Sequence, residues 1–266
     1  MKFFLLKPRW LVLHLIALGL AILFTNFGFW QLRRLEQRQA QNQILQERLS
    51  DQPRALSELI SQFKTNVPAS DKNSIALRPA FTEGQFDTSE EVLLRTADNY
   101  NGQPGYYLLT PLILENETVL LVKRGWVPFD LNKPPITEAK PASSDKVNVE
   151  GFLLEPQTEP TGFWASLAPR NPEGELDITA YLDVERLEKQ MPYELLPFVL
   201  ELETQAPEQA GVFPQPNEAP TFTNGSHLGY AIQWFSFTLI GVVGYIILMI
   251  GLNKERQSRT SRKAPG

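Results

Sequence analysis

The sequence predicts a membrane protein of the α+β class, in which two terminal transmembrane helices flank an external, mainly antiparallel β-sheet or barrel domain. Residues 10–32 and 229–253 are two runs without a charged side chain, and each exceeds the roughly 20 residues that span about 30 Å of hydrocarbon. Short β-like segments separated by turns lie between the two runs. No long amphipathic helix separates most of these segments, which disfavours a parallel βαβ sheet.

The first apolar run is expected to be a retained membrane anchor. A cleaved signal peptide has a shorter apolar core and a small-x-small cleavage site, whereas here the run continues into Asn26-Phe27-Gly28-Phe29-Trp30-Gln31. Residues 33–49 then read as a polar continuation of the same helix, which Asp51-Gln52-Pro53 ends. Residues 56–63 place apolar side chains at helical spacing and predict a second, short helix.

The sequence pattern in the middle of the chain is typical of a β domain. A helix is expected at residues 184–191, before Pro192, and residues 206–220, which contain four prolines, are expected to be extended. Turn signals such as Asn101-Gly102 separate most of the strand-like runs. The expected strands are residues 75–86, 91–96, 106–114, 118–127, 147–154 and 196–202.

Basic residues orient the two apolar runs. Residues 209–228, before the second run, contain no Lys or Arg, whereas five basic residues lie in residues 254–266. Cytoplasmic flanks are enriched in Lys and Arg. Residues 1–9 and 254–266 are therefore expected to be cytoplasmic, and residues 33–228 to form an external, periplasmic domain.

Composition excludes several functional classes. The chain has no cysteine, and residues 31–226 contain no histidine, so disulfides, thiolate metal sites and histidine-based triads cannot form in the soluble region. Residues 33–228 hold 29 of the 30 acidic residues but only 17 of the 25 basic ones, which excludes a nucleic-acid binder. We expect Glu90 and Glu91 to lie on the solvated surface, and we expect no enzymatic activity.

His227, one of only two histidines, opens the second apolar run. On a helix, Tyr230, Ala231 and Trp234 share its face. The small Ala231 would leave room for a flat ligand such as a porphyrin, with His227 binding the iron and Tyr230 and Trp234 as walls. The alternative stays open, because Tyr and Trp gather at membrane interfaces and a histidine at a helix start can simply bond to a loop.

His14 lies near the cytoplasmic start of the first run, so the two imidazoles are expected to differ in depth by roughly 25 Å. They cannot share one iron in a monomer, and we expect His14 to be a packed or interfacial polar residue. Ala17-x-x-x-Ala21 and Gly241-x-x-Gly244 are expected to be surfaces for close helix packing.

Four blocks, in this order and between two terminal membrane helices, resemble the Surfeit locus protein 1 family. The resemblance covers nearly the whole chain, although residues 163–183 match the family pattern poorly. The blocks are Gly28-Phe29-Trp30-Gln31-Leu32-Arg33-Arg34, Gly105-Tyr106-Tyr107-Leu108-Leu109-Thr110-Pro111-Leu112, Val122-Lys123-Arg124-Gly125-Trp126-Val127-Pro128 and His227-Leu228-Gly229-Tyr230-Ala231-Ile232-Gln233-Trp234-Phe235.

The resemblance implies an accessory membrane protein of cytochrome c oxidase assembly, located in the bacterial inner (plasma) membrane. It implies transient haem a binding through the histidine of the last block, here His227, and insertion of that haem into the catalytic subunit. The implied partners are this catalytic subunit, haem a synthase and the lipid bilayer. A scaffold that holds the same partners without touching haem is the alternative.

Further residues of the four blocks are candidates for a partner-binding or structural motif. For Arg124, a structural ion pair and a partner contact stay open. Gly125 can permit a turn, and Trp126 can fill a core. The full set is Trp30, Gln31, Arg33, Arg124, Gly125, Trp126 and Gln233.

Overall fold

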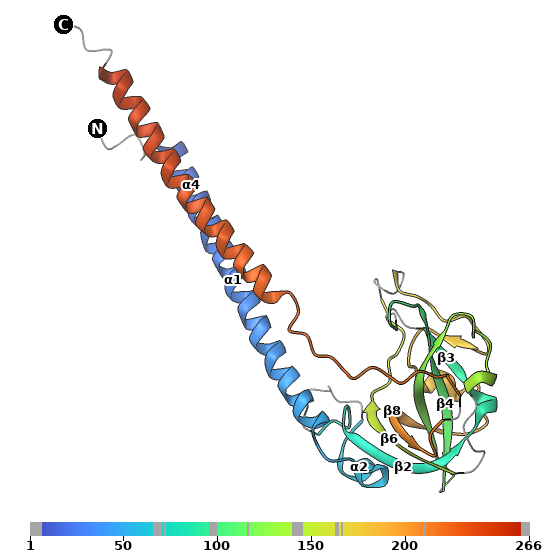
Figure 1. Cartoon of the computed structure of the whole chain (residues 1–266). Coiled ribbons are helices and arrows are strands. Elements are labelled where there is room, and N and C mark those ends of the chain that lie inside the picture. The colour runs from blue at the N-terminus through green and yellow to red at the C-terminus, as the bar shows by residue number, and fades with distance from the viewer. Residues whose placement is uncertain are drawn as a thin grey trace. The chain divides into compact units, whose positions relative to one another are not determined.

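The computed structural model (Figure 1) describes residues 7–65, 71, 73–95, 100–115, 117–139, 146–162, 165, 167–209 and 211–261. The chain forms two compact units, one of Met1–Gln43 with Phe222–Gly266 and one of Ile44–Thr221. Residues 1–6 and 262–266, which belong to the expected cytoplasmic ends, lie outside the described residues, as do Phe163, Trp164 and Ser166 of the poorly matching stretch.

The first unit is a pair of long antiparallel helices, α1 (Pro8–Leu49) and α4 (His227–Ser261), which lie side by side (Figure 1). Both are long and apolar enough to cross a membrane. Their outward faces expose large aliphatic side chains, including Leu15 and Ile247, a surface that suits lipid better than water. The helical continuation after residue 32 is confirmed, and α1 ends at Leu49, immediately before the predicted break.

The second unit is a sheet domain with short helices. The helix α2 (Leu56–Gln62) confirms the second predicted helix, and α3 (Val184–Glu188) confirms the third, although it ends before residue 191. Two short 3₁₀ turns are η1 (Thr88–Glu90) and η2 (Thr137–Ala139). The strands are β1 (Arg54–Ala55), β2 (Pro79–Phe86), β3 (Val92–Arg95), β4 (Gly105–Leu114), β5 (Val119–Pro128), β6 (Val147–Leu154), β7 (Ile178–Thr179) and β8 (Leu195–Ala206).

The strand order is β1-β2-β6-β8-β5-β4-β3-β7, and a further pairing of β2 with β4 closes a ring of strands. Five of these pairings are antiparallel, whereas β1–β2, β3–β7 and β5–β8 are parallel. The sheet is therefore mixed. The parallel pair β5–β8 is possible because the long connection through β6 and α3 brings the chain back in the same direction.

Apolar side chains of both strands and helices form the core. Inside the ring, Leu112, Leu120, Leu153 and Phe198 belong to one buried cluster, which α2 covers with Leu59. A second cluster joins the sheet to α3. Because β4, β5 and β8 are apolar along most of their length, they are covered on more than one side.

Differences from the predicted elements have local causes. β2 begins at Pro79 instead of residue 75, because Leu77 has a positive φ of 56° and turns the chain before the strand. β1 and β7 were not predicted, since a strand of two residues carries no alternating pattern. The proline-rich residues after β8 form no helix or strand in the described part, as predicted, apart from one bridge at Gln215.

Candidate functional site

The candidate site lies where the first unit brings the end of the apolar part of α1 beside the start of α4. Nδ1 of His227 is 2.9 Å from Oε1 of Gln31. An amide oxygen only accepts hydrogen bonds, so Nδ1 carries the proton in this arrangement. Nε2 then keeps its lone pair, which is the form of imidazole that binds a metal.

Close packing of α1 on α4 accompanies this hydrogen bond and sets the position along the helices at which Gln31 and His227 meet. A Cβ atom at Gly28 would lie 2.6 Å from the ring of Phe235, so a glycine is needed for the helices to approach one turn from Gln31. Ala231 is only 1% exposed, one turn along α4 from His227. The space expected beside Ala231 is therefore filled by α1, because this residue faces the neighbouring helix.

The turn before α4 lies beside the imidazole. Gly225 has a φ of +66°, and a Cβ atom there would lie 3.7 Å from Nε2 of His227, which is an ordinary van der Waals distance. The glycine is exposed and adds no side chain beside Nε2. Asn42 donates to the carbonyl oxygen of Thr223 (3.1 Å) and so ties this turn to α1.

The two expected aromatic walls lie in different environments. Tyr230 is 50% exposed and lies to one side of the helix contact. Trp234 packs into the contact, with its ring centroid 5.4 Å from that of Phe24 and 5.0 Å from that of Phe27. Only Tyr230 therefore stands at an accessible surface on the face of His227.

His14 lies far from His227, as expected. Its Nδ1 is hydrogen-bonded to the hydroxyl of Tyr245, and the two rings meet edge to face. Tyr245 comes eighteen residues after His227 on α4, which is roughly 27 Å at 1.5 Å per residue. The structure confirms that the two imidazoles cannot share one iron within this chain.

The remaining helix residues of the motif set point away from the His227–Gln31 contact. Trp30, Arg33 and Gln233 are exposed. They flank Gln31 or follow His227 in the sequence, but they lie on other faces of the two helices. A role for them must therefore involve the surroundings of the helix pair.

In the sheet domain, Arg124 lies on β5 with a side chain that is 0% exposed. It pairs with Glu91 (3.2 Å) and donates to the carbonyl oxygen of Ala139 (2.7 Å) and to Oε1 of Gln209 (2.9 Å). Burial lowers the pKa of Arg124 to about 10, against the opposing effect of Glu91. The structure thus shows the ion pair, one of the two roles left open for Arg124.

Glu91 corrects the sequence-based expectation of a solvated carboxylate. It is buried, and burial raises its pKa. The Thr110 hydroxyl (3.0 Å) and the Ile136 backbone N–H (2.9 Å) donate to it in addition to Arg124. The expectation was wrong because a carboxylate with this many donors can stay inside a fold.

Gly125 and Trp126 hold the segment that follows β8. The backbone N–H and carbonyl of Trp126 pair with those of Gln215, each at 2.8 Å, and Tyr100 stacks on the indole with ring centroids 5.2 Å apart. Gly125 has a φ of +151°, and a Cβ atom there would lie 2.1 Å from the carbonyl oxygen of Gln215. Only glycine permits this close approach.

A family model described as the SURF1 family matches residues 18–239, which include the helix contact at His227 and the Arg124–Trp126 motif. The chain belongs to the SURF1 family. This is a family of oxidase assembly factors and not a catalytic family.

Curated relatives extend over most of the SURF1-family chain. An uncharacterized SURF1-like protein of Mycobacterium bovis is 26% identical over 247 residues, 91% of this chain and 83% of its own length. A SURF1-like protein of Rickettsia felis is 24% identical over 236 residues (88% and 95%). One of Monosiga brevicollis is 24% identical over 263 residues (95% and 92%). The likeness therefore includes both terminal helices and the domain.

The partner of His227 was not recognised from the sequence of this SURF1-family chain, although Gln31 was in the motif set. The available signal was topological. Two antiparallel membrane helices place the end of the first beside the start of the second, so a polar side chain at residue 31 can meet one at residue 227. Glu91 gave no such signal, because its donors come from three separate segments.

Replacing Glu91 with Gln is expected to lower the free energy of unfolding by about 3–5 kcal/mol, because it leaves Arg124 buried without its counter-charge. Thermal unfolding of the full chain in detergent, followed by circular dichroism, measures the change. Glu115→Gln is the matched control, since Glu115 also pairs with a cation, Lys146, but on the exposed surface. An equal effect of both substitutions would contradict a role for the buried pair.

Gly125→Ala is expected to destabilise the SURF1-family domain by roughly 1–3 kcal/mol and to release the segment at Gln215 from β5, because the methyl group and the carbonyl oxygen cannot share one position. Gly102→Ala is the control: its φ is +80°, but a Cβ atom there meets nothing within 4 Å. Limited proteolysis should cleave residues 211–221 faster in Gly125→Ala only. Equal cleavage rates in the two variants would show that the close approach is unimportant.

Proposed function

We propose that this SURF1-family chain is an assembly factor of the bacterial inner membrane that binds haem a through Nε2 of His227 and aids its insertion into the catalytic subunit of a cytochrome c oxidase. The observation that carries the proposal is the hydrogen bond from Nδ1 of His227 to Oε1 of Gln31. Metal-binding histidines characteristically donate their second ring N–H to such an acceptor, which fixes the ring and the tautomer.

The ligands available near His227 favour haem over a bare metal ion. Among the described residues, no group of three or more His, Cys, Asp and Glu side chains could hold a metal ion. A porphyrin supplies its own equatorial nitrogen ligands, so a haem needs only one imidazole from the protein. The absence of a side chain at Gly225, which lies beside Nε2, and the exposed Tyr230 ring support a flat ligand at this position.

We further propose that α1 and α4 cross the membrane with both termini in the cytoplasm. Their length and apolar surface support insertion, and the basic residues 254–266 support this orientation. His227 then lies at the outer rim of the bilayer, and the sheet domain lies in the periplasm. The proposed carrier needs two partners, haem a synthase to supply the haem and the oxidase catalytic subunit to receive it.

A single axial ligand leaves the other face of the iron open. Within this chain, His14 cannot supply the second ligand, because it lies roughly 25 Å from His227 along the helices. The proposed site is therefore suited to holding haem temporarily and releasing it, and not to permanent electron transfer.

The proposal predicts that the full chain, co-expressed with haem a biosynthesis and purified in detergent, carries a haem absorption spectrum that His227→Ala abolishes. Gln31→Ala should retain the ligand but lower haem occupancy, about 10- to 100-fold in affinity, because the ring loses its orienting acceptor. Glu115→Gln, on the exposed surface of the sheet domain, is the control and should leave the spectrum unchanged. An unchanged spectrum in His227→Ala would reject His227 as the ligand.

A scaffold that holds oxidase assembly partners without binding haem is the second candidate. The exposed Trp30, Arg33 and Gln233 favour it, because motif residues on the outer faces of the helix pair are available to other membrane proteins. The scaffold predicts that oxidase assembly survives His227→Ala but fails when Trp30 and Gln233 are replaced. Oxidase activity of the membranes separates the two candidates.

A further inference from the structure

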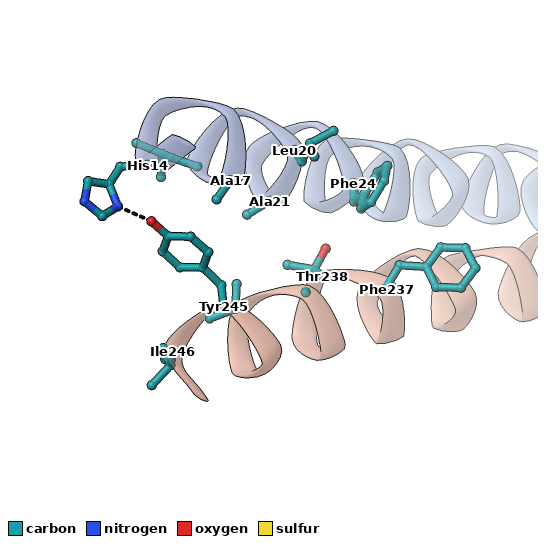
Figure 2. Close-up of a pocket in the computed structure, with 12 residues that line it drawn as sticks. His14, Ala17, Leu20, Ala21, Phe24, Phe237, Thr238, Tyr245 and Ile246 are labelled. Carbon is teal, nitrogen blue, oxygen red and sulfur yellow. Dashed lines mark hydrogen bonds between the residues drawn. The ribbon is translucent and has the colours of Figure 1, made fainter. Parts of the chain in front are cut away.

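A hollow lies within the helix pair, further along α4 than His227. It has a volume of about 340 Å³ and is lined by residues of both α1 and α4. Phe24 and Phe237 lie toward the His227 end of the hollow, and the hydrogen-bonded His14 and Tyr245 lie at its other end (Figure 2). Between these ends the wall is made largely of small and aliphatic side chains.

The small residues here line space and do not make the close contact that the sequence predicted. Ala17, Ala21 and Gly241 all line the hollow. A Cβ atom at Gly241 or Gly244 would meet no other atom within 4 Å. Within this chain the two glycines therefore make no close helix contact, whereas Gly28 packs tightly on Phe235. Packing of these glycines against a partner stays a prediction. The helix pair is closed at the level of His227 and open below it.

The hollow is well placed for a chain attached to a ligand at His227. Phe237 comes ten residues after His227, roughly 15 Å along α4, and Tyr245 lies about 12 Å further. Trp234 links the two levels, since its ring centroid lies 5.4 Å from that of Phe24 and 5.9 Å from that of Phe237. A porphyrin edge reaching the level of Trp234 would thus bring a substituent to the mouth of the hollow.

Haem a carries a substituent of this kind, a hydroxyethylfarnesyl chain, which haem b lacks. We propose that the hollow between α1 and α4 takes the farnesyl chain of haem a and makes the protein selective for haem a over haem b. This inference rests on the proposed function. The farnesyl chain is apolar, and so is most of the wall of the hollow. The polar pair His14–Tyr245 ends this apolar wall at the far end.

A polar group of the wall supports placing the porphyrin end of the farnesyl chain at the outer end of the hollow. The hydroxyl of Thr238 lines the hollow near its outer end and donates to the carbonyl oxygen of Trp234 (3.1 Å). Its oxygen accepts a long hydrogen bond from the Thr25 hydroxyl (3.5 Å) and has a second lone pair, which can accept a hydrogen bond from another hydroxyl. The hydroxyl of the hydroxyethylfarnesyl group lies at the porphyrin end of that chain, which matches this end of the hollow.

The experiment titrates the full chain in detergent with haem a and haem b, and follows the absorption shift and the quenching of tryptophan fluorescence. We expect the wild type to bind haem a about tenfold more tightly, a modest factor because detergent and lipid also accept the chain. Gly241→Leu should fill the hollow, bring haem a affinity down to that of haem b, and leave haem b binding unchanged.

Gly244→Leu is the matched control, because it adds the same side chain three residues further along α4, also into open space, but does not line the hollow. It should bind both haems like the wild type. Equal binding of haem a and haem b by the wild type, or equal behaviour of the two leucine variants, would mean that the hollow holds only lipid, and the inference would be overturned while His227 could still bind haem.

Iron-free porphyrins make the test independent of the iron ligand. Without iron, Nε2 of His227 contributes no metal bond. Porphyrin a also carries a formyl group that protoporphyrin IX lacks, so the comparison uses porphyrin o, which differs from protoporphyrin IX in the hydroxyethylfarnesyl group only. We expect a preference for porphyrin o in the wild type and in His227→Ala, but not in Gly241→Leu. If neither porphyrin quenches the fluorescence, or if both quench it equally, the farnesyl assignment fails. This holds whatever the haem spectrum shows about His227.

Discussion

The hydrogen bond between His227 and Gln31 is the interaction on which the candidate site depends. It joins residues 196 positions apart, and it fixes the depth of the imidazole, its orientation and the nitrogen that carries the proton. A shift of one residue along α1 would turn Gln31 by about 100° around the helix and remove the contact. The tight packing of Gly28 on Phe235 and the bond from Asn42 to Thr223 hold this register from both sides.

In the sheet domain, a buried ion pair between Arg124 and Glu91 connects distant segments. Taking Arg124 and Glu91 out of water costs free energy, as the direction of both pKa shifts shows, so the pair is a poor source of stability compared with apolar side chains. The pair instead connects separate segments, because Arg124 also donates to Ala139 and Gln209. Gly125 adds the close approach to Gln215 that positions the segment after β8.

Much of the fold could be predicted because it depends on local patterns. Two apolar runs predicted α1 and α4, and strand-like runs between turn signals predicted six of the strands within a few residues. The helix before Pro192 was predicted as well, although α3 ends at Glu188. The parallel pairing of β5 with β8 and the ring closure between β2 and β4 could not be predicted, because they depend on contacts between distant segments. Strands of two residues, such as β7, have no pattern to detect.

The candidate site was predicted in its residue types but not in its arrangement. His227 stands where its position at the head of the second apolar run placed it, but a helical face drawn from α4 alone could not show that α1 covers Ala231. The same limit explains the small-residue motifs. Spacing alone cannot distinguish a glycine that meets a neighbouring helix, such as Gly28, from one that borders a hollow, such as Gly241.

The difference between these two levels of the helix pair bears on how a carrier can release its ligand. At the level of His227 the helices are in contact, and the structure offers one metal-binding nitrogen. Further along the pair, the only other histidine is bonded to Tyr245 and borders the hollow between α1 and α4. In the proposed site, with one iron ligand and one apolar hollow, neither contact alone would hold a haem firmly. Binding that needs both contacts would be selective, and loss of either one to a partner would be enough to begin the proposed transfer.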